Sequence, residues 1–551
     1  MLSLVALLIA HCAMAVPPPG SQVIYLGTFF TSDPAQPIVE AIAVAGGRIV
    51  LVGTEAEVLA SAASDAERVR VQGFVVPGFA DAHIHVEGVG EQLEKLDLQG
   101  LDKATALRRV AAAARQAPRG AWVEGGGWDE GFWGAAGFPT ARELDAVSAG
   151  HPVVLDRIDG HSTWINSRVL AIAGIDRHTV DPPGGAIRHD ARGEPTGILV
   201  DNAQKLLEHV RPKPTHADRV RRIQQALGQF ARWGLTSVHD AGVDLETIAI
   251  YEDLLKHGAL TVRVYAMLAG EEARRQAITE GPRPDMGEGR LAVRSFKLFL
   301  DGALGSRGAE LSEPYADAPE TKGLELMSDS DLDKVIRLAL AHGFQVNVHA
   351  IGDRAVHRAL DAFERAGVGP AQRFRIEHAS VVRDEDVPRF ARLGVIASVQ
   401  PVFVGEYSRW AEARVGPARV RWVLRTADLL ASGARLAAGS DYPASDSGDP
   451  RATLAGLVTR ESAMGTPAGG WHPAQSVPIA AALPLMWAGP AYAAFAERNL
   501  GALTVGRYAD FTVLNADPRA VPPFKLRSLE VWGTVVGGRI VYRRSATFSH
   551  R

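Results

Sequence analysis

The sequence predicts an α/β protein whose centre is a (β/α)8 TIM barrel, with an inserted α/β subdomain and a small composite β-sandwich formed by both chain ends. Two observations predict the barrel. Eight short apolar runs recur along the chain, the later ones separated by stretches with helical spacing, and several runs end on a histidine, lysine or aspartate. In such a barrel the carboxyl ends of the strands surround one mouth. We therefore expect these polar residues to meet in one site.

The eight barrel strands are expected at residues 75–80, 236–240, 262–267, 294–300, 345–349, 373–378, 395–400 and 435–439. Segments 203–235 and 328–342 carry apolar residues at helical spacing, as crossover helices between parallel strands require. Together these elements place the barrel within residues 75–495.

Two histidines, His83 and His85, follow the first predicted strand. Because side chains two residues apart point to the same face of a strand, both imidazoles are expected on one side. Two neutral ring nitrogens that converge at a strand end can bind zinc. Surface histidines with the same spacing are also common, so the pair alone is weak evidence.

Four further candidate ligands stand at the ends of later strands: Lys297, His349, His378 and Asp441. A buried ammonium group is costly unless it is paired, deprotonated or chemically modified, although a strand-end lysine can also extend its amine to water. Taken singly, the histidines fit structural roles, and Asp441 fits a turn or a helix N-cap. The repeated placement at strand ends favours a shared metal site.

The connection between the first two strands is too long for a barrel loop, and residues 95–210 are expected to form an inserted α/β subdomain that caps the mouth. It contains the glycine-rich run 124–130, a strand-like run at 152–158 and a hairpin at 186–199. The candidate substrate contacts in it are Trp128, Asp129, Asp159 and His161, with local loop structure as the alternative. The glycine run lacks the spacing of a nucleotide-binding loop.

Arg307 lies in a glycine-rich loop just after the strand that carries Lys297. Its guanidinium could bind a substrate carboxylate or carbonyl group. A solvated or salt-bridged arginine explains the position equally well.

Residues 16–74 and 496–551 alternate short strand-like runs with turns. Each half is too short for a stable core, so the two are expected to pair into one small β-sandwich beside the barrel.

The first 15 residues have an apolar core followed by Ala13-Met-Ala15, which is typical of a cleaved signal peptide and predicts a periplasmic or secreted protein. No lysine or arginine precedes that core, and it is too short to span a membrane. Cys12 is the single cysteine of the chain, so the mature protein would have no disulfide; lipid attachment there is disfavoured by the bulky His11. The formal net charge of −4, without a basic block, argues against a nucleic-acid partner.

Motifs at 77–85, 125–129, 297–302, 348–353, 376–379 and 439–443 give the chain a resemblance to a known family. The chain resembles the amidohydrolase superfamily, within it the amidohydrolase family 3 branch that includes N-substituted formamide deformylase. The resemblance implies a two-metal site with zinc as the favoured ion, made by His83, His85, an N-carboxylated Lys297 as the bridging ligand, His349, His378 and Asp441. It also implies the capping insertion and the composite terminal domain.

The implied function is a metal-dependent hydrolase that cleaves a carbon–nitrogen bond other than a peptide bond, an amide or formamide, in a small molecule. A metal-bridged hydroxide would attack the carbonyl, and Asp441 would act as general base and then general acid. One alternative is lactone or ester hydrolysis at the same site, and another is a non-catalytic binding or regulatory protein. Similar enzymes are often dimers, which is compatible with a homodimer here.

Overall fold

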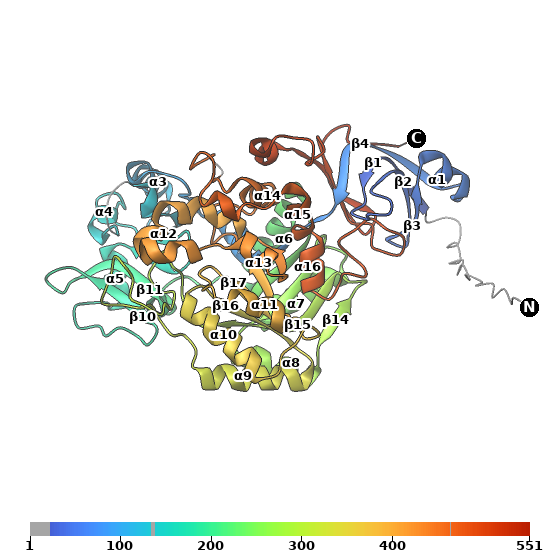
Figure 1. Cartoon of the computed structure of the whole chain (residues 1–551). Helices are drawn as coiled ribbons and strands as arrows, with labels where there is room; N and C mark the ends of the chain where they lie inside the picture. Colours follow the sequence, from blue (N-terminus) through green and yellow to red (C-terminus); the bar gives the residue numbers. More distant parts are fainter. Residues whose placement is uncertain (1–21, 134–137, 463, 551) are drawn as a thin grey trace, which may run out of the picture.

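The structure, a computed structural model, describes residues 22–133, 138–462 and 464–550, and these residues form three β-sheets (Figure 1). The predicted signal peptide, with Cys12, lies outside the described residues. In the part that is described, no helix is both long and apolar enough to cross a membrane.

The central sheet consists of eight parallel strands that follow one another in chain order around a barrel. They are β5 (Phe79–Ile84), β12 (Leu235–Val243), β13 (Arg263–Leu268), β15 (Leu291–Phe299), β16 (Gln345–Ala350), β17 (Arg375–His378), β18 (Ile396–Val399) and β19 (Arg435–Ala438). The short β14 (Arg283–Met286) pairs antiparallel with β15 outside this ring. The structure thus confirms the predicted (β/α)8 barrel.

The ring closes where the last strand meets the first. The backbone N–H of Asp441 donates to the carbonyl of His83 at 2.6 Å, and that of Ser440 donates to the Asp81 carboxylate at 3.0 Å. Gly439 makes this approach possible, because a Cβ at that position would lie 2.5 Å from the backbone nitrogen of His83. Strand β19 therefore delivers Asp441 directly beside the histidines that follow β5.

The first barrel strand begins later than the sequence predicted. Residues 75–77 end β4 (Glu67–Pro77), which pairs with β20 (Phe511–Leu514) in the sheet of the chain ends. The barrel strand begins only at Phe79, after Gly78, whose N–H donates to the carbonyl of Asp510. One continuous apolar run thus serves two sheets, and residue spacing does not show where the chain passes from one to the other.

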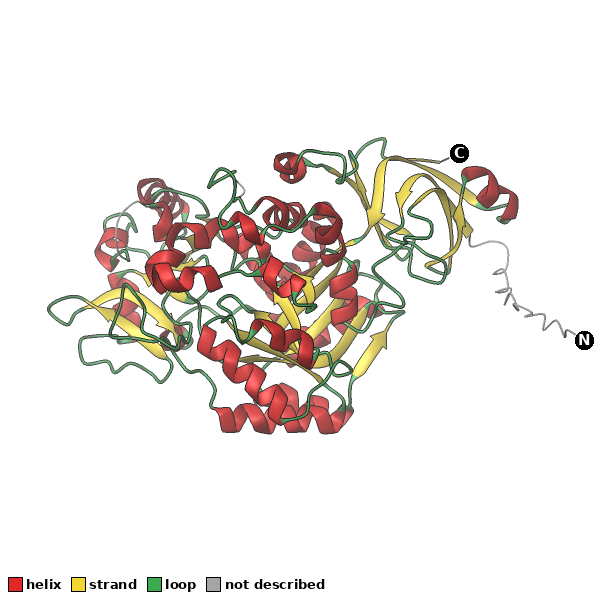
Figure 2. Cartoon of the chain, viewed as in Figure 1, coloured by secondary structure: helices red, strands yellow, loops and turns green. Residues whose placement is uncertain are grey.

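Helices pack around the barrel (Figure 2). They are α2 (Val86–Glu94), α6 (His216–Trp233), α7 (Leu245–Lys256), α8 (Glu271–Glu280), α9 (Asp329–His342), α10 (Asp353–Arg365), α11 (Val387–Leu393), α12 (Val404–Arg419), α13 (Thr426–Ala431), α14 (Pro450–Thr459), α15 (Ile479–Leu485) and α16 (Ala488–Ala493). The two ends of helix α6 are set by local sequence. Thr215 and Asp218 form a capping box at its start, and Gly234, with φ 85°, ends it. Its buried Ile223, Leu227 and Phe230 join the barrel core.

The insertion between β5 and β12 contains a six-stranded mixed sheet on one side of the barrel (Figure 1). Its strands are β6 (Leu96–Asp97), β7 (Val123–Trp128), β8 (Val153–Arg157), β9 (Ser162–Ile165), β10 (Gly185–His189) and β11 (Pro195–Asp201), and its helices are α3 (Lys103–Gln116), α4 (Ala141–Asp145) and α5 (Ser167–Ala173). Strands β10 and β11 form the expected hairpin. The aromatic side chains of Trp128 and Trp164 lie in its core.

The two chain ends join in one eight-stranded sheet on the opposite side of the barrel (Figure 1). The N-terminal part gives β1 (Gln22–Phe30), β2 (Ile38–Ala45), β3 (Arg48–Gly53), helix α1 (Glu55–Ser61) and β4, and the C-terminal part gives β20, β21 (Val531–Val536), β22 (Arg539–Arg543) and β23 (Phe548–His550). Strand β4 connects the halves, because it pairs with β1 on one edge and with β20 on the other.

The contact between α2 and α6 gives a test of the packing. A Cβ on Gly90 of α2 would lie 2.0 Å from the carbonyl oxygen of Arg222 on α6, so Gly90→Ala must push the helices apart. We expect it to lower the free energy of unfolding by about 1–3 kcal/mol, measured by chemical denaturation. The control is Gly228→Ala on the exposed side of α6, where the nearest atom would lie 4.0 Å away and the change is expected to stabilise the helix slightly. Equal stabilities for the two variants would contradict this packing.

Candidate active site

A cavity of about 790 Å³ opens between the carboxyl ends of the barrel strands and the insertion. The barrel side of its wall includes His85, Lys297, His349, His378 and Asp441. The opposite side comes mainly from the insertion. Predicted ligands from the ends of five different strands therefore line one cavity.

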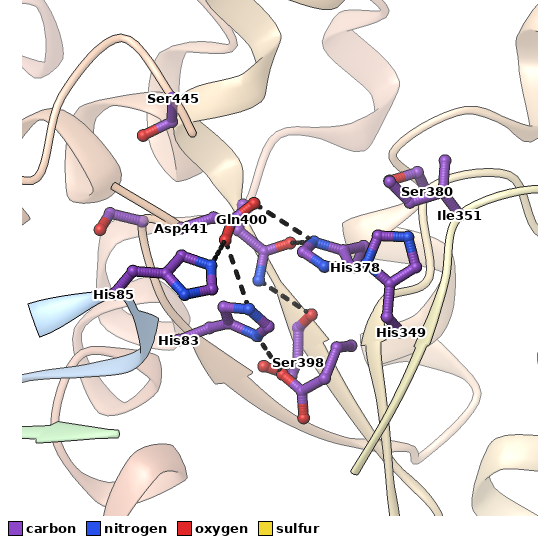
Figure 3. Close-up of polar contacts among 12 residues, drawn as sticks. His83, His85, His349, Ile351, His378, Ser380, Ser398, Gln400, Asp441 and Ser445 are labelled. Carbon is purple, nitrogen blue, oxygen red and sulfur yellow. Dashed lines mark hydrogen bonds and ion pairs between the residues drawn. The ribbon is translucent and has the colours of Figure 1, made fainter. Parts of the chain in front are cut away.

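Asp441 is the point on which the first two histidines converge (Figure 3). Its Oδ1 lies 3.1 Å from Nε2 of His85 and 3.3 Å from Nε2 of His83. Its Oδ2 lies 3.8 Å from Nδ1 of His378. The side chain of His83 is fully buried, whereas that of His85 is 35% exposed. Both imidazoles thus approach the same carboxylate oxygen, in line with the prediction that they lie on one side.

The orientation of His83 is fixed from behind by a buried ion pair. Nδ1 of His83 lies 2.5 Å from Oε2 of Glu377, which also accepts a hydrogen bond from Nη2 of Arg375 at 3.0 Å. A proton held on Nδ1 by the carboxylate leaves Nε2 with its lone pair free for a metal ion. Burial, followed by the positive charge of Lys297, holds the pKa of His83 well below its usual range, so the ring is neutral.

His378 and His349 form the other side of the cluster, with ring centroids 4.5 Å apart. His378 donates from Nδ1 to Oε1 of Gln400 at 2.9 Å, which again leaves Nε2 available. Nε2 of His349 is buried, lies 3.5 Å from Asp301 Oδ1, and has no hydrogen-bond partner among the described residues. Burial holds the pKa of both rings well below the usual value, followed by the neighbouring imidazole (His378 for His349, and His83 for His378) and then by Lys297.

Lys297 is buried within this cluster, with Nζ 3.3 Å from Nε2 of His83 and 4.5 Å from the ring centroid of Phe299. Burial lowers the pKa of its amine from 10.5 to about 8, although Glu377 and Asp441 oppose the shift. Burial destabilises the ammonium form of Lys297, so its amine loses the proton at a lower pH than an exposed lysine does. The side chain points into the cavity rather than out to solvent, in contrast to the alternative of an extended surface lysine.

These side chains fit a metal ion. One donor atom each from His83, His378 and Asp441 lie within 4.8 Å of one another. The buried, unpartnered Nε2 of His349 is the kind of atom that a metal would satisfy. Imidazole nitrogens with carboxylate oxygen are ligands that suit zinc and similar divalent ions.

Strained backbone occurs at two of the same residues. His378 and Asp441 adopt φ angles of 73° and 63°, in the left-handed region. Such conformations cost on the order of 1–3 kcal/mol each and persist where the surrounding structure holds them. They are consistent with side chains that are positioned for function rather than for stability.

Two of the predicted substrate contacts reach the cavity. His161 and Asp159 both line it, and Nδ1 of His161 lies 2.5 Å from Oδ1 of Asp201. Burial alone would lower the pKa of His161, but the Asp201 carboxylate outweighs it and raises the pKa to about 9. His161 is therefore positively charged at neutral pH. Asp159 is held in place by Nη1 of Arg157 at 2.7 Å.

The structure corrects the prediction for the other three candidates. Trp128 lies in the core of the insertion, where its indole N–H donates to the carbonyl of Leu155. Asp129 is buried in ion pairs with Arg157 and Arg409, so that it fastens the insertion to α12. Arg307 pairs with Asp317 at 2.9 Å, away from the cavity wall. All three side chains serve structural contacts, which composition and spacing could not distinguish from substrate contacts.

Several residues that shape the site were not predicted from the sequence. Asp201 ends a strand of the insertion, a position like those of the predicted ligands, and this signal could have revealed it. Glu377 directly precedes His378, but nothing local shows that it contacts His83. The wall formed by Phe403, Tyr407 and Trp410 is visible in the sequence only as aromatic residues at helical spacing, a pattern that ordinary core residues share.

Comparison with known proteins identifies the family. A family model described as "Amidohydrolase family" matches residues 72–542. The chain belongs to the amidohydrolase family. This confirms the resemblance seen in the sequence motifs, and the protein is a hydrolase of this family.

Individual relatives agree with that assignment. "Putative amidohydrolase YtcJ" of Bacillus subtilis is 35% identical, with 87% of this chain and 91% of the relative covered. N-substituted formamide deformylase of Arthrobacter pascens is 28% identical, with 94% and 97% covered. The crystal structure of an uncharacterized metal-dependent hydrolase from Pyrococcus horikoshii superimposes with a TM-score of 0.73 at 30% identity, covering 91% of this chain and 99% of that one.

The ion pair behind His83 makes a prediction about metal affinity. Glu377→Gln removes the carboxylate that holds the proton on Nδ1, and we expect the affinity for zinc to fall by on the order of 10- to 100-fold. Isothermal titration of the metal-free protein with zinc measures it, and circular dichroism checks that the variant folds. Glu385→Gln, at an exposed position, is the matched control. An unchanged affinity for Glu377→Gln would remove this residue from the metal site.

Proposed function

We propose that this amidohydrolase cleaves the carbon–nitrogen bond of an amide or formamide in a small molecule. The observation that carries the proposal is the convergence of the Nε2 atoms of His83 and His85 on the Asp441 carboxylate, in a cavity whose wall includes Asp441 and His85. A carboxylate beside metal-ligating nitrogens can exchange a proton with a water molecule positioned there. The relation to a protein named N-substituted formamide deformylase supports the choice of bond.

Two divalent ions, with zinc favoured, would be held by His83, His85, Lys297, His349, His378 and Asp441. When bound, they would supply a water molecule of lowered pKa and polarisation of the substrate carbonyl group. We propose that Lys297 serves as a carbamate, since its amine reaches the neutral form needed to react with carbon dioxide near pH 8. The ammonium first loses one proton to solvent. The neutral amine nitrogen then bonds to the carbon of carbon dioxide and releases a second proton, so that a cation becomes an anionic oxygen ligand.

Proton movement is assigned to Asp441 and His161. Asp441 takes a proton from the attacking water at its carboxylate and returns it to the leaving nitrogen. His161 keeps one proton on Nδ1, where Asp201 accepts it, and presents the other on Nε2. From the cavity wall that N–H can donate to the substrate carbonyl oxygen and stabilise the charge that develops on it.

Asp441→Asn tests the proton transfer. The amide cannot accept the proton of the attacking water, so we expect kcat to fall by on the order of 10²- to 10⁴-fold towards whichever N-formyl or N-acyl compound the wild type hydrolyses. The exposed Asp384→Asn is the control and is expected to retain full activity. Turnover near the wild-type rate in Asp441→Asn would exclude Asp441 as the base.

Lys297→Ala tests the metal centre independently of any substrate. Protein expressed with added bicarbonate is expected to contain two metal ions per chain by elemental analysis, and the variant one or none. The exposed Lys334→Ala should leave the metal content unchanged. Wild-type protein without metal after reconstitution would contradict the proposed centre and favour a non-catalytic role.

A further inference from the structure

A row of aromatic rings leads from the candidate metal site along the cavity wall. The ring of Phe403 stacks on His378 with centroids 6.1 Å apart and an interplanar angle of 18°. Tyr407 stacks on Phe403 at 5.4 Å and 5°, and Trp410 contacts Tyr407 at 4.6 Å. Phe403 is the N-cap residue of α12, and Tyr407 and Trp410 follow it at a spacing that keeps the three side chains on one face. All three residues line the cavity.

Beside this row, two buried polar atoms are left unsatisfied. Glu406 also lines the cavity and is only 2% exposed, yet its Oε1 has no hydrogen-bond partner in the described part of the chain. Nε1 of Trp410 lacks a partner among the same residues. A buried polar group without a partner costs on the order of 1–3 kcal/mol, so the acceptor Oε1 of Glu406 marks a place where a ligand can supply a donor.

The surroundings of Glu406 lack a balancing positive charge. Within the described residues, no lysine, arginine or histidine forms an ion pair with it, and the nearby Arg157 and Arg409 both pair with Asp129. Burial, followed by the carboxylates of Asp446 and Asp129, raises the pKa of Glu406 well above its ordinary range. The position therefore has an excess of carboxyl groups over cations, which a cationic ligand would relieve.

We infer that Glu406, together with the rings of Phe403, Tyr407 and Trp410, binds a positively charged amino group of the substrate. On binding, the Glu406 carboxyl group would release its proton to solvent. The ammonium would then donate a charge-assisted hydrogen bond to the carboxylate and be attracted by the aromatic faces. The substrate class is then a small molecule with an amide or formamide at one end and an ammonium group at the other, joined by an apolar or aromatic spacer. This rests on the proposed amide hydrolysis.

The arrangement also predicts what the site discriminates against. A neutral substrate of the same shape would cover the rings but leave the Glu406 carboxyl group without a partner. A substrate with a terminal carboxylate would add a further negative charge beside the Asp129 and Asp446 carboxylates and be rejected. Selectivity between amine and neutral isostere is therefore the property to measure.

The test is a comparison of benzylammonium with benzyl alcohol as ligands, by isothermal titration near neutral pH. We expect the wild type to bind the ammonium compound at least about tenfold more tightly than the alcohol. Glu406→Gln keeps the shape of the side chain without its charge and should remove the difference. Glu412→Gln changes the same charge on the exposed face of α12 and should leave it intact.

Two results would overturn the inference: equal binding of the two ligands by the wild type, or a preference that persists in Glu406→Gln. The second result would also show that the amine is bound elsewhere, for example by a metal ion. Glu406→Asp retains the charge and is expected to keep part of the preference, which separates loss of charge from loss of folding. Thermal denaturation checks that all variants are folded.

A pair of substrates separates this inference from the proposed function. The compounds are 1,4-bis(aminomethyl)benzene carrying one N-formyl group and N-formyl-4-methylbenzylamine. We expect the wild type to hydrolyse the ammonium compound with a kcat/KM about tenfold higher than that of the methyl compound. In Glu406→Gln the two values of kcat/KM should be equal. Hydrolysis of both at equal rates would support amide cleavage and refute the ammonium site. Preferential binding of benzylammonium without hydrolysis of either compound would support the site and refute amide cleavage.

Discussion

The closure of the barrel between β19 and β5 is the constraint on which the site depends. Asp441 and His85 are 356 positions apart in the chain, and they meet because the N–H of Asp441 donates to the carbonyl of His83. Gly439 allows that approach, and Asp441 accepts a left-handed backbone to turn its carboxylate towards the histidines. If these strands separated, the first and last ligands of the candidate metal site would no longer share a centre.

Buried charge is the second feature that organises this part of the molecule. Ionisable groups are accommodated in the barrel interior in two ways. Some are paired, as Arg375 is with Glu377, and that pair in turn fixes the tautomer of His83. Others shift their proton affinity: burial raises the pKa of Asp81 to about 7 and that of Asp301 to about 8, and lowers that of Lys297 to about 8. Pairing thus stabilises the charged form of Arg375 and Glu377, whereas burial favours the neutral form of the other three groups.

The barrel, the insertion and α12 contribute different side chains to the cavity. The strand ends carry the side chains suited to bind metal and move protons, which agrees with membership of the amidohydrolase family. The insertion contributes His161 and Asp201, and α12 contributes an aromatic wall with Glu406. Asp129 connects the last two elements through its ion pairs with Arg157 and Arg409. The shape of the cavity therefore depends on contacts that are remote from the barrel core.

The sequence by itself determined the strand–helix alternation and the polar residues at strand ends, because both are properties of local spacing in a parallel barrel. It could not show that residues 75–77 belong to a different sheet from Phe79, or that Trp128, Asp129 and Arg307 face partners other than the cavity. Nor could it reveal that Glu377 supports His83, or that Glu406 is left without a countercharge. Those features arise when distant segments pack together, and only the tertiary structure decides which buried side chain faces which neighbour.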